Sequence, residues 1–130
     1  MRSAAEPARQ VLFVDDEPSI GMMVGFALGP SGYAVLTAHN GRDALKLYAA
    51  HHHELDVVVV DYILPDMRGD QLVAKMAEID GAVPFVCMSG HSRHEIAPDL
   101  RRRAAVFLHK PFNLSSLADR LDEALLGVPA

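Results

Sequence analysis

The chain has 130 residues, of which 50% are hydrophobic and 22% are charged, and its formal net charge is −5. This length and composition are typical of one globular domain with one hydrophobic core, and they leave no room for a second domain of ordinary size. The acidic balance gives no electrostatic reason to expect direct binding to nucleic acid, because proteins that bind nucleic acid present basic surfaces.

Three further features bear on location. Cys87 is the only cysteine, so no disulfide can form within the chain, which fits a reducing compartment. Residues 1–10 lack the apolar core of a signal peptide. No apolar stretch approaches the roughly 20 residues of a membrane-spanning helix. We therefore expect a cytoplasmic protein that does not insert into a membrane.

The pattern predicts one folded domain over residues 10–126, with flexible tails at residues 1–9 and 127–130. Short apolar runs predict five strands, and several of these runs are apolar at consecutive rather than alternating positions. Consecutive apolar residues are typical of strands that are buried on both faces, as in a parallel sheet covered by helices. The five runs are Val11–Val14, Tyr33–Thr37, Val57–Val60, Pro84–Met88 and Val106–Leu108.

Helices are predicted between these strands. Pro18 suits the first turn of a helix that ends near Leu28, while Asn40 and Asn113 are suited to cap two later helices. An apolar stripe at helical spacing marks one more helix, through Leu72, Val73, Met76 and Ile79.

Two details of these helices are also predicted. Gly21 and Gly25 lie four residues apart, and we expect both to allow close approach of the first helix to its neighbours. The segment Ser92–Arg103 has the weakest helical pattern because it contains Pro98, and whether it forms a regular helix is left open.

Strands alternating with helices predict an α/β fold, a doubly wound (βα)₅ arrangement with a five-stranded parallel sheet. The common strand order for five strands is 2-1-3-4-5, as in flavodoxin-like folds, with the topological switch point between the first and third strands. Functional sites on such sheets lie at the carboxyl ends of the strands.

Polar residues follow four of the five predicted strands at that edge: Asp15–Asp16, Asp61, Ser89–Gly90 and Lys110. At about 5 Å and an effective dielectric constant near 20, each pair of carboxylates repels by roughly 3 kcal/mol. A divalent cation removes that cost, and oxygen ligands that leave room for water suit Mg²⁺. The lysine and the serine hydroxyl can bind phosphoryl oxygens, so the group predicts a phosphoryl site with a carboxylate nucleophile.

Four segments together resemble the receiver domain of two-component response regulators, including the chemotaxis regulators. These segments are Val11–Pro18, Val57–Gly69, Val86–Gly90 and Val106–Phe112. The resemblance extends over residues 10–126. It implies that Asp61 accepts a phosphoryl group from the phosphohistidine of a histidine kinase or histidine phosphotransfer protein, with Mg²⁺ as cofactor and Mn²⁺ as a possible substitute.

The resemblance also implies roles for the metal ligands. Asp16 would bind Mg²⁺ directly and Asp15 largely through water. Asp61 and the backbone carbonyl of Ile63 would complete the protein ligands, and Lys110 would contact the phosphoryl group.

Ser89 and Phe107 would form the conformational switch. The family often has Tyr at the position of Phe107, and Phe has no hydroxyl group, so this switch would rest on packing. Ile63, Gly90 and His91 would form the rim of the phosphoryl site.

The resemblance implies a signalling phosphoacceptor, which catalyses only its own phosphorylation and dephosphorylation, rather than an enzyme. The output protein is not identified, and we expect a monomer or a weak, phosphorylation-dependent dimer. There are two alternatives. One is a phospho-independent interaction domain of the same fold, and the other is a receiver excised from a hybrid histidine kinase or larger regulator. A phosphohydrolase of the haloacid dehalogenase type is disfavoured, because such enzymes place a second acid where this chain has Ile63.

Overall fold

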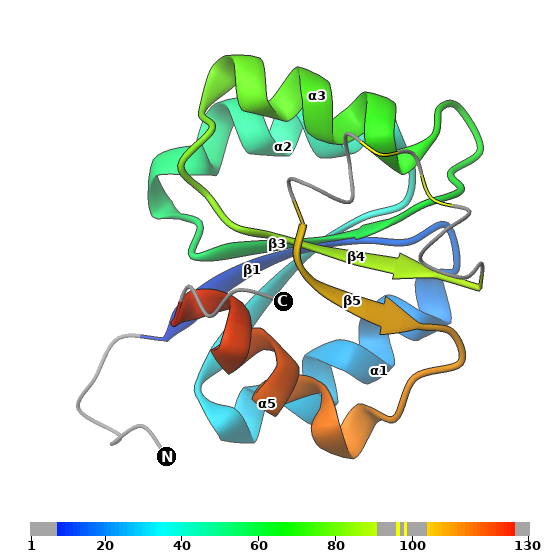
Figure 1. Ribbon diagram of the computed structural model, residues 1–130. Helices are drawn as coiled ribbons and strands as arrows, with labels where there is room; N and C mark the ends of the chain where they lie inside the picture. Colours follow the sequence, from blue (N-terminus) through cyan, green and yellow to red (C-terminus); the bar gives the residue numbers. More distant parts are fainter. Residues whose placement is uncertain (1–7, 91–95, 97, 99–103, 127–130) are drawn as a thin grey trace.

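The computed structural model describes residues 8–90, 96, 98 and 104–126. Five parallel strands form one sheet in the order β2-β1-β3-β4-β5, which confirms the predicted topology (Figure 1). β1 begins at Arg9, one residue before the predicted start of the domain, because Arg9 pairs with Tyr33 of β2. The strands are β1 (Arg9–Val14), β2 (Tyr33–Ala38), β3 (Val57–Asp61), β4 (Phe85–Ser89) and β5 (Ala104–His109).

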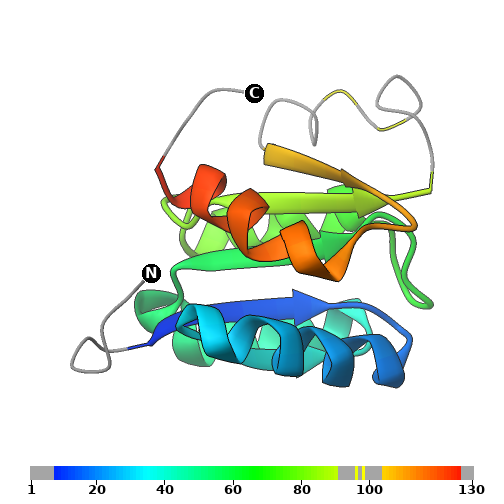
Figure 2. The same cartoon turned by 90° about the horizontal axis from the view of Figure 1, so that it is seen from below.

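Four α-helices in the described residues cover the two faces of the sheet: α1 (Pro18–Leu28), α2 (Gly41–His51), α3 (Gly69–Ile79) and α5 (Leu114–Leu125). Helices α2 and α3 lie on one face, and α1 and α5 lie side by side on the other (Figures 1 and 2). Short 3-10 helices follow α1 and α2, at Gly29–Ser31 and His52–Glu54. Within the described ranges, none of the helices is long and apolar enough to cross a membrane. Most of the segment Ser92–Arg103 lies outside the described residues, so the question of a regular helix there stays open.

The predicted helix starts are confirmed by local hydrogen bonds. The Asn40 side chain accepts a hydrogen bond of 2.7 Å from the backbone N–H of Asp43. The Asn113 side chain accepts one of 2.9 Å from the N–H of Ser115. Pro18 lies in the first turn of α1, where its missing N–H has no carbonyl to bind in any case. Helices α1, α2 and α5 therefore begin where the sequence supplies a residue suited to that position.

The core has two parts, one on each face of the sheet. Along β3, Val58 and Val60 pack under α2 and α3, while Val57 and Val59 pack over α1 and α5. All four side chains are fully buried, and burying one Val side chain contributes about 1.5–3 kcal/mol to folding. The run of valines therefore marks a central strand that has no solvent-facing side.

The glycines of α1 and α3 differ in how closely their neighbours approach. A Cβ on Gly21 would lie 3.0 Å from the Thr37 side chain, which confirms the predicted close approach there. No atom lies within 4 Å of a Cβ on Gly25, so the prediction is wrong for that residue. Four residues turn a helix by about 40° more than one full rotation, which carries Gly25 away from the sheet. Gly69 is the most crowded of the three, since its Cβ would lie 2.7 Å from the backbone oxygen of Asp61.

We predict opposite effects of alanine at Gly69 and Gly25. Gly69→Ala forces a methyl group against the β3 backbone and should lower the free energy of unfolding by about 1–3 kcal/mol. Gly25→Ala meets no neighbour and should raise the free energy of unfolding by up to about 1 kcal/mol through helix propensity. Urea unfolding measures both values, and a Gly69→Ala variant as stable as the wild type would contradict the packing described here.

Candidate functional site

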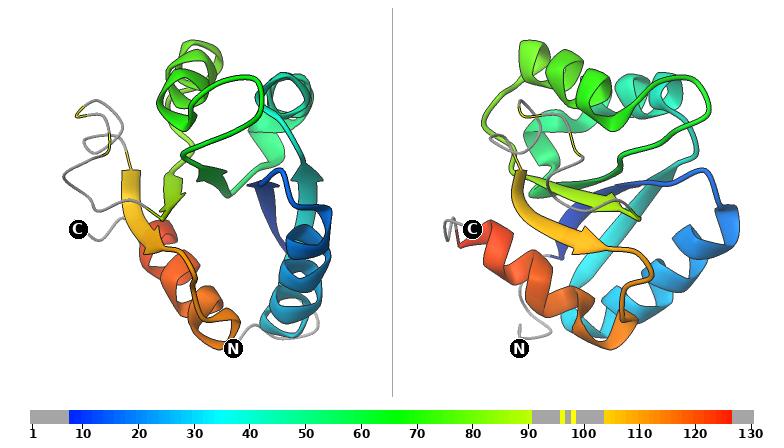
Figure 3. Two further views of the ribbon diagram at one scale, coloured as in Figure 1. Left: turned by 90° about the vertical axis from the view of Figure 1, so that its right-hand side faces the viewer. Right: turned by 45° about the vertical axis from the view of Figure 1, so that its right-hand side comes forward.

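Acidic side chains from two neighbouring strands meet at the carboxyl edge of the sheet, which faces the viewer in the left panel of Figure 3. Asp15 follows β1 and is 1% exposed, and Asp61 ends β3 and is 6% exposed, whereas Asp16 is exposed. One carboxylate oxygen from each of these three residues lies within 4.8 Å of the others. The structure thus brings the three predicted acids together at the switch point between β1 and β3.

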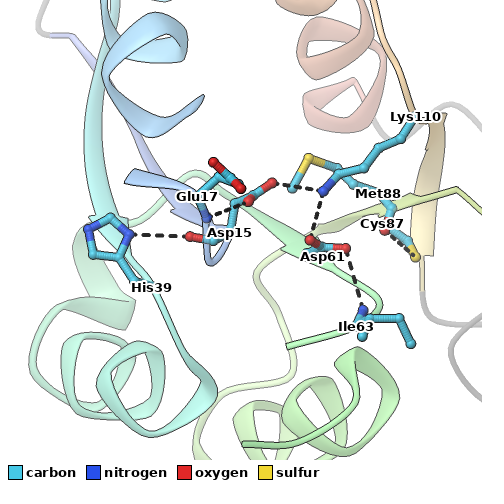
Figure 4. Close-up of polar contacts among 8 residues, drawn as sticks. All are labelled: Asp15, Glu17, His39, Asp61, Ile63, Cys87, Met88 and Lys110. Carbon is cyan, nitrogen blue, oxygen red and sulfur yellow. Dashed lines mark hydrogen bonds and ion pairs between the residues drawn. The ribbon is translucent and has the colours of Figure 1, made fainter. Parts of the chain in front are cut away.

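Lys110, which follows β5, contacts two of these acids, Asp15 and Asp61 (Figure 4). Its Nζ donates to Asp15 Oδ2 at 2.9 Å and to Asp61 Oδ2 at 2.7 Å. Its backbone N–H donates to the carbonyl of Ser89 at 2.8 Å, and the peptide bond to Pro111 is cis. The ammonium group therefore bridges two carboxylates that otherwise repel each other.

The pKa values of Asp61 and Lys110 both respond to this arrangement. Burial raises the pKa of Asp61, and the hydrogen bond and charge of Lys110 lower it without fully offsetting the effect of burial, to which the charge of Asp15 adds. Burial lowers the pKa of Lys110, but its hydrogen bonds with Asp61 and Asp15 outweigh burial, so that pKa is raised. The charged form of Lys110 is thus stabilised by two carboxylates. The charged form of Asp61 is stabilised by one cation and destabilised by the charge of Asp15. The site retains an excess of negative charge.

The backbone around the carboxylates supplies further hydrogen bonds. The N–H of Glu17 donates to Asp15 Oδ1 at 2.9 Å, and the N–H of Ile63 lies 3.4 Å from Asp61 Oδ1. The Ile63 side chain is 51% exposed and points away from the carboxylate in Figure 4. Ile63 therefore lies beside Asp61, with its backbone N–H toward the acid.

The predicted switch and rim residues are placed as follows. Ser89 ends β4 and is buried, and Gly90 beside it is exposed. Phe107 lies on β5 and is half-buried against the core cluster under α2 and α3, and its carbonyl accepts a hydrogen bond of 2.8 Å from Arg120. His91 lies outside the described residues.

Two residues beside the site were not predicted from the sequence. The Nδ1 atom of His39 lies 3.2 Å from the backbone carbonyl of Asp15, on the side away from Lys110 (Figure 4). Asp66, in the loop after β3, accepts hydrogen bonds from the N–H groups of Gly41 and Arg42. Both contacts join residues about 24 positions apart, so no local pattern reveals them.

The donor set fits a hard divalent cation. Asp15, Asp16 and Asp61 offer carboxylate oxygens at mutual distances that one ion can span, and Mg²⁺ is bound in proteins by one or two carboxylates together with water. The exposure of Asp16 leaves room for that water. The half-buried Lys110 supplies a positive charge beside Asp61. The arrangement can bind a metal ion and an anionic group at the same carboxylate.

Known proteins match nearly the whole chain. The family model for the response regulator receiver domain matches residues 11–122. The sensor kinase CckA of Brucella abortus is 34% identical over 88% of this chain and 12% of its own length. The probable transcriptional regulatory protein TcrX of Mycobacterium tuberculosis is 34% identical over 93% of this chain and 51% of its own length. The chain thus spans about half or less of these two curated relatives.

Solved structures match over nearly their full length. The chemotaxis response regulator CheY4 of Vibrio cholerae is 31% identical, with a TM-score of 0.73 over 91% of this chain and 99% of that one. The receiver domain from the hybrid histidine kinase CckA is 29% identical, with a TM-score of 0.75 over 89% and 98% of the two chains. With its strand order, its acidic edge and these matches, the chain belongs to the response regulator receiver domain family of two-component systems.

Proposed function

We propose that Asp61 accepts a phosphoryl group from a phosphohistidine on a histidine kinase or histidine phosphotransfer protein. The observation that carries this proposal is the buried Asp61 carboxylate, which shares Lys110 with Asp15 and lies within one ion's reach of Asp15 and Asp16. Attack by an Asp61 oxygen forms the acyl phosphate bond and breaks the bond between phosphorus and the histidine nitrogen, and the imidazole leaves.

The residues of the chain position and neutralise the reacting groups. Asp15, Asp16, Asp61 and the carbonyl of Ile63 would hold Mg²⁺, or Mn²⁺ in its place, and the ion would neutralise phosphoryl oxygens. Lys110 would exchange part of its ion pair for a phosphoryl oxygen, since its ammonium group lies 2.7 Å from the accepting carboxylate. Charges held next to the accepting carboxylate stabilise the negative charge that develops during the transfer.

The phosphoryl group would then bias a conformational equilibrium through Ser89 and Phe107. Ser89 is buried at the end of β4, and Cys87 on that strand pairs with Phe107 on β5. A hydroxyl group drawn toward the new anion leaves space that an aromatic ring can fill. Phe107 is half-buried on the neighbouring strand, two positions before His109, the residue that pairs with Ser89. The signal would pass to the output protein by contact, through a change of packing.

The partner and the wider context are part of this proposal. Helix α1, which begins three residues after Asp15, carries no charged residue and exposes Met22, Met23 and Phe26, a surface suited to packing against a phosphodonor helix. A cytoplasmic location fits the buried, free thiol of Cys87. The relatives include both a sensor kinase and transcriptional regulatory proteins, so the receiver, which we delimit to residues 10–126, would act alone or within a longer protein.

Asp61→Asn should abolish phosphorylation by acetyl phosphate and Mg²⁺ while leaving the fold intact, because the amide has no nucleophilic oxygen anion. Intact-protein mass spectrometry measures the added phosphoryl group, and hydroxylamine should remove that group from the wild type. Asp43→Asn is the control, since this exposed acid belongs to no part of the site. Phosphorylation of Asp61→Asn at the wild-type level would overturn the assignment.

Lys110→Gln should separate metal binding from phosphoryl transfer. In the wild type the ammonium group competes with Mg²⁺ for two carboxylates. Without it, Mg²⁺ should bind about 10-fold more tightly, because this change in binding free energy is a modest part of the Coulomb energy between such charges. The phosphorylation rate should fall by about 100-fold, as when one preorganised charge is lost from an active site. Calorimetry and a phosphorylation time course measure the two effects, with exposed Lys75→Gln as the control; weaker Mg²⁺ binding with an unchanged rate would refute this role.

The lifetime of the phosphorylated form should depend on Ile63, whose apolar side chain offers an attacking water no hydrogen bond. Ile63→Asn should speed dephosphorylation about fivefold, the equivalent of one net hydrogen bond of about 1 kcal/mol. Decay of the phosphorylated protein after removal of the phosphodonor gives the rate. The matched control is Ile79→Asn, because Ile79 is also a partly exposed isoleucine but lies at the far end of α3. Equal decay in Ile63→Asn and the wild type would count against this idea.

A further inference from the structure

Residues 39–42, which comprise the turn after β2 and the first two residues of α2, contact both of the loops that follow the acidic strands. On one side, His39 Nδ1 lies 3.2 Å from the carbonyl of Asp15, and since a carbonyl only accepts, the imidazole donates. On the other side, the N–H groups of Gly41 and Arg42 donate to Asp66 Oδ1 at 2.7 Å and to Asp66 Oδ2 at 2.9 Å. This turn supplies none of the three acids, yet it links the segments that carry them.

Asp66 makes two charge-assisted hydrogen bonds with the start of α2. Gly41 and Arg42 are the first two residues of α2, and their N–H groups have no partner within the helix. A carboxylate that accepts both hydrogen bonds also lies at the positive end of the helix dipole. Slight burial raises the pKa of Asp66, but the hydrogen bonds from Gly41 and Arg42 outweigh it, and the pKa is lowered. Both oxygens of Asp66 are therefore directed at α2.

Asp66 lies at the tip of a loop that is closed at its base. The loop, residues 62–68, begins and ends at neighbouring points because the N–H of Gly69 donates to the carbonyl of Tyr62 at 2.6 Å. Within the loop, Leu64 donates to the carbonyl of Met67 at 3.2 Å, and Ile63 forms an antiparallel bridge with Arg68. These contacts make the loop rigid, so a displacement of its tip also moves Ile63.

The tip also fits closely against α2. Met67 lies over Gly41 so tightly that a Cβ on that glycine would be 2.5 Å from the Met67 side chain. The side chain of Met67 packs against the core cluster under α2 and α3. The loop is therefore held by a polar contact and an apolar contact at the same end of α2.

We propose that Asp66 is a positioning residue of the metal site: by fastening the loop of residues 62–68 to the first turn of α2, it fixes the Ile63 backbone beside Asp61. This inference rests on the proposed function, in which the Ile63 carbonyl and Asp61 bind Mg²⁺. Asp66 itself binds no metal. It acts through a loop whose N–H at Ile63 already lies 3.4 Å from the Asp61 carboxylate.

The test is a calorimetric Mg²⁺ titration of the full chain at a temperature where circular dichroism shows every variant folded. Asp66→Ala removes both hydrogen bonds, and the dissociation constant for Mg²⁺ should rise about 10-fold, as when an outer partner of a metal ligand is lost. Asp66→Asn keeps the shape but accepts with one oxygen only, so its dissociation constant should lie between those of Asp66→Ala and the wild type. Asp43→Asn removes the same charge from the same end of α2, and its Mg²⁺ affinity should match the wild type.

The amide resonance of Ile63 provides a second readout, in the metal-free protein. Its chemical shift should move in both Asp66 variants and stay in place in Asp43→Asn. Wild-type Mg²⁺ affinity in Asp66→Asn, or in a folded Asp66→Ala, would overturn this inference while leaving the proposed function intact. If the wild type binds no Mg²⁺, the proposed function fails, and this inference fails with it.

Discussion

Repulsion between buried carboxylates is the constraint on which the rest of this site depends. Asp15 and Asp61 are almost fully buried and are brought together by neighbouring parallel strands, an arrangement that costs several kcal/mol unless positive charge is supplied. Lys110 supplies one charge from the end of β5. The exposed Asp16 adds a third acid, so a single lysine cannot neutralise the group, and the Mg²⁺ that we propose would complete the balance.

The fold confines this acidic group to one edge of the sheet. The sheet is held by apolar side chains on both faces, so the polar residues are confined to the carboxyl edge. There the proposed Mg²⁺ would require a fixed spacing between the loops after β1 and β3, because this ion demands near-ideal distances to its ligands. The turn from β2 to α2 contacts both loops through His39 and Asp66, and we regard it as the part of the frame that sets this spacing.

Local signals in the sequence were sufficient for the elements and their order. Four consecutive valines predict a strand buried on both faces, and Pro18 and Asn40 mark helix starts because their effects act within one turn. The convergence of Asp15, Asp61 and Lys110 followed from the strand order alone. The contacts of Asp66 and His39 could not be predicted, since each joins residues far apart in the chain and depends on how closely a loop meets a helix. The prediction for Gly25 was wrong for a related reason. The spacing of residues along the chain indicates which of them share a helix face, but not how far that face is turned toward the sheet.

The central claim is that Asp61 is a metal-assisted phosphoryl acceptor, and a crystal structure of the protein with Mg²⁺ and beryllofluoride tests it most directly. Beryllofluoride mimics a phosphoryl group on a carboxylate. The account predicts beryllium bonded to an oxygen of Asp61, Mg²⁺ beside the carboxylates of Asp15 and Asp16, and the ammonium group of Lys110 on a fluoride. Crystals grown with both reagents in excess that show Asp61 still paired with Lys110, and no beryllofluoride bound to it, would contradict the account.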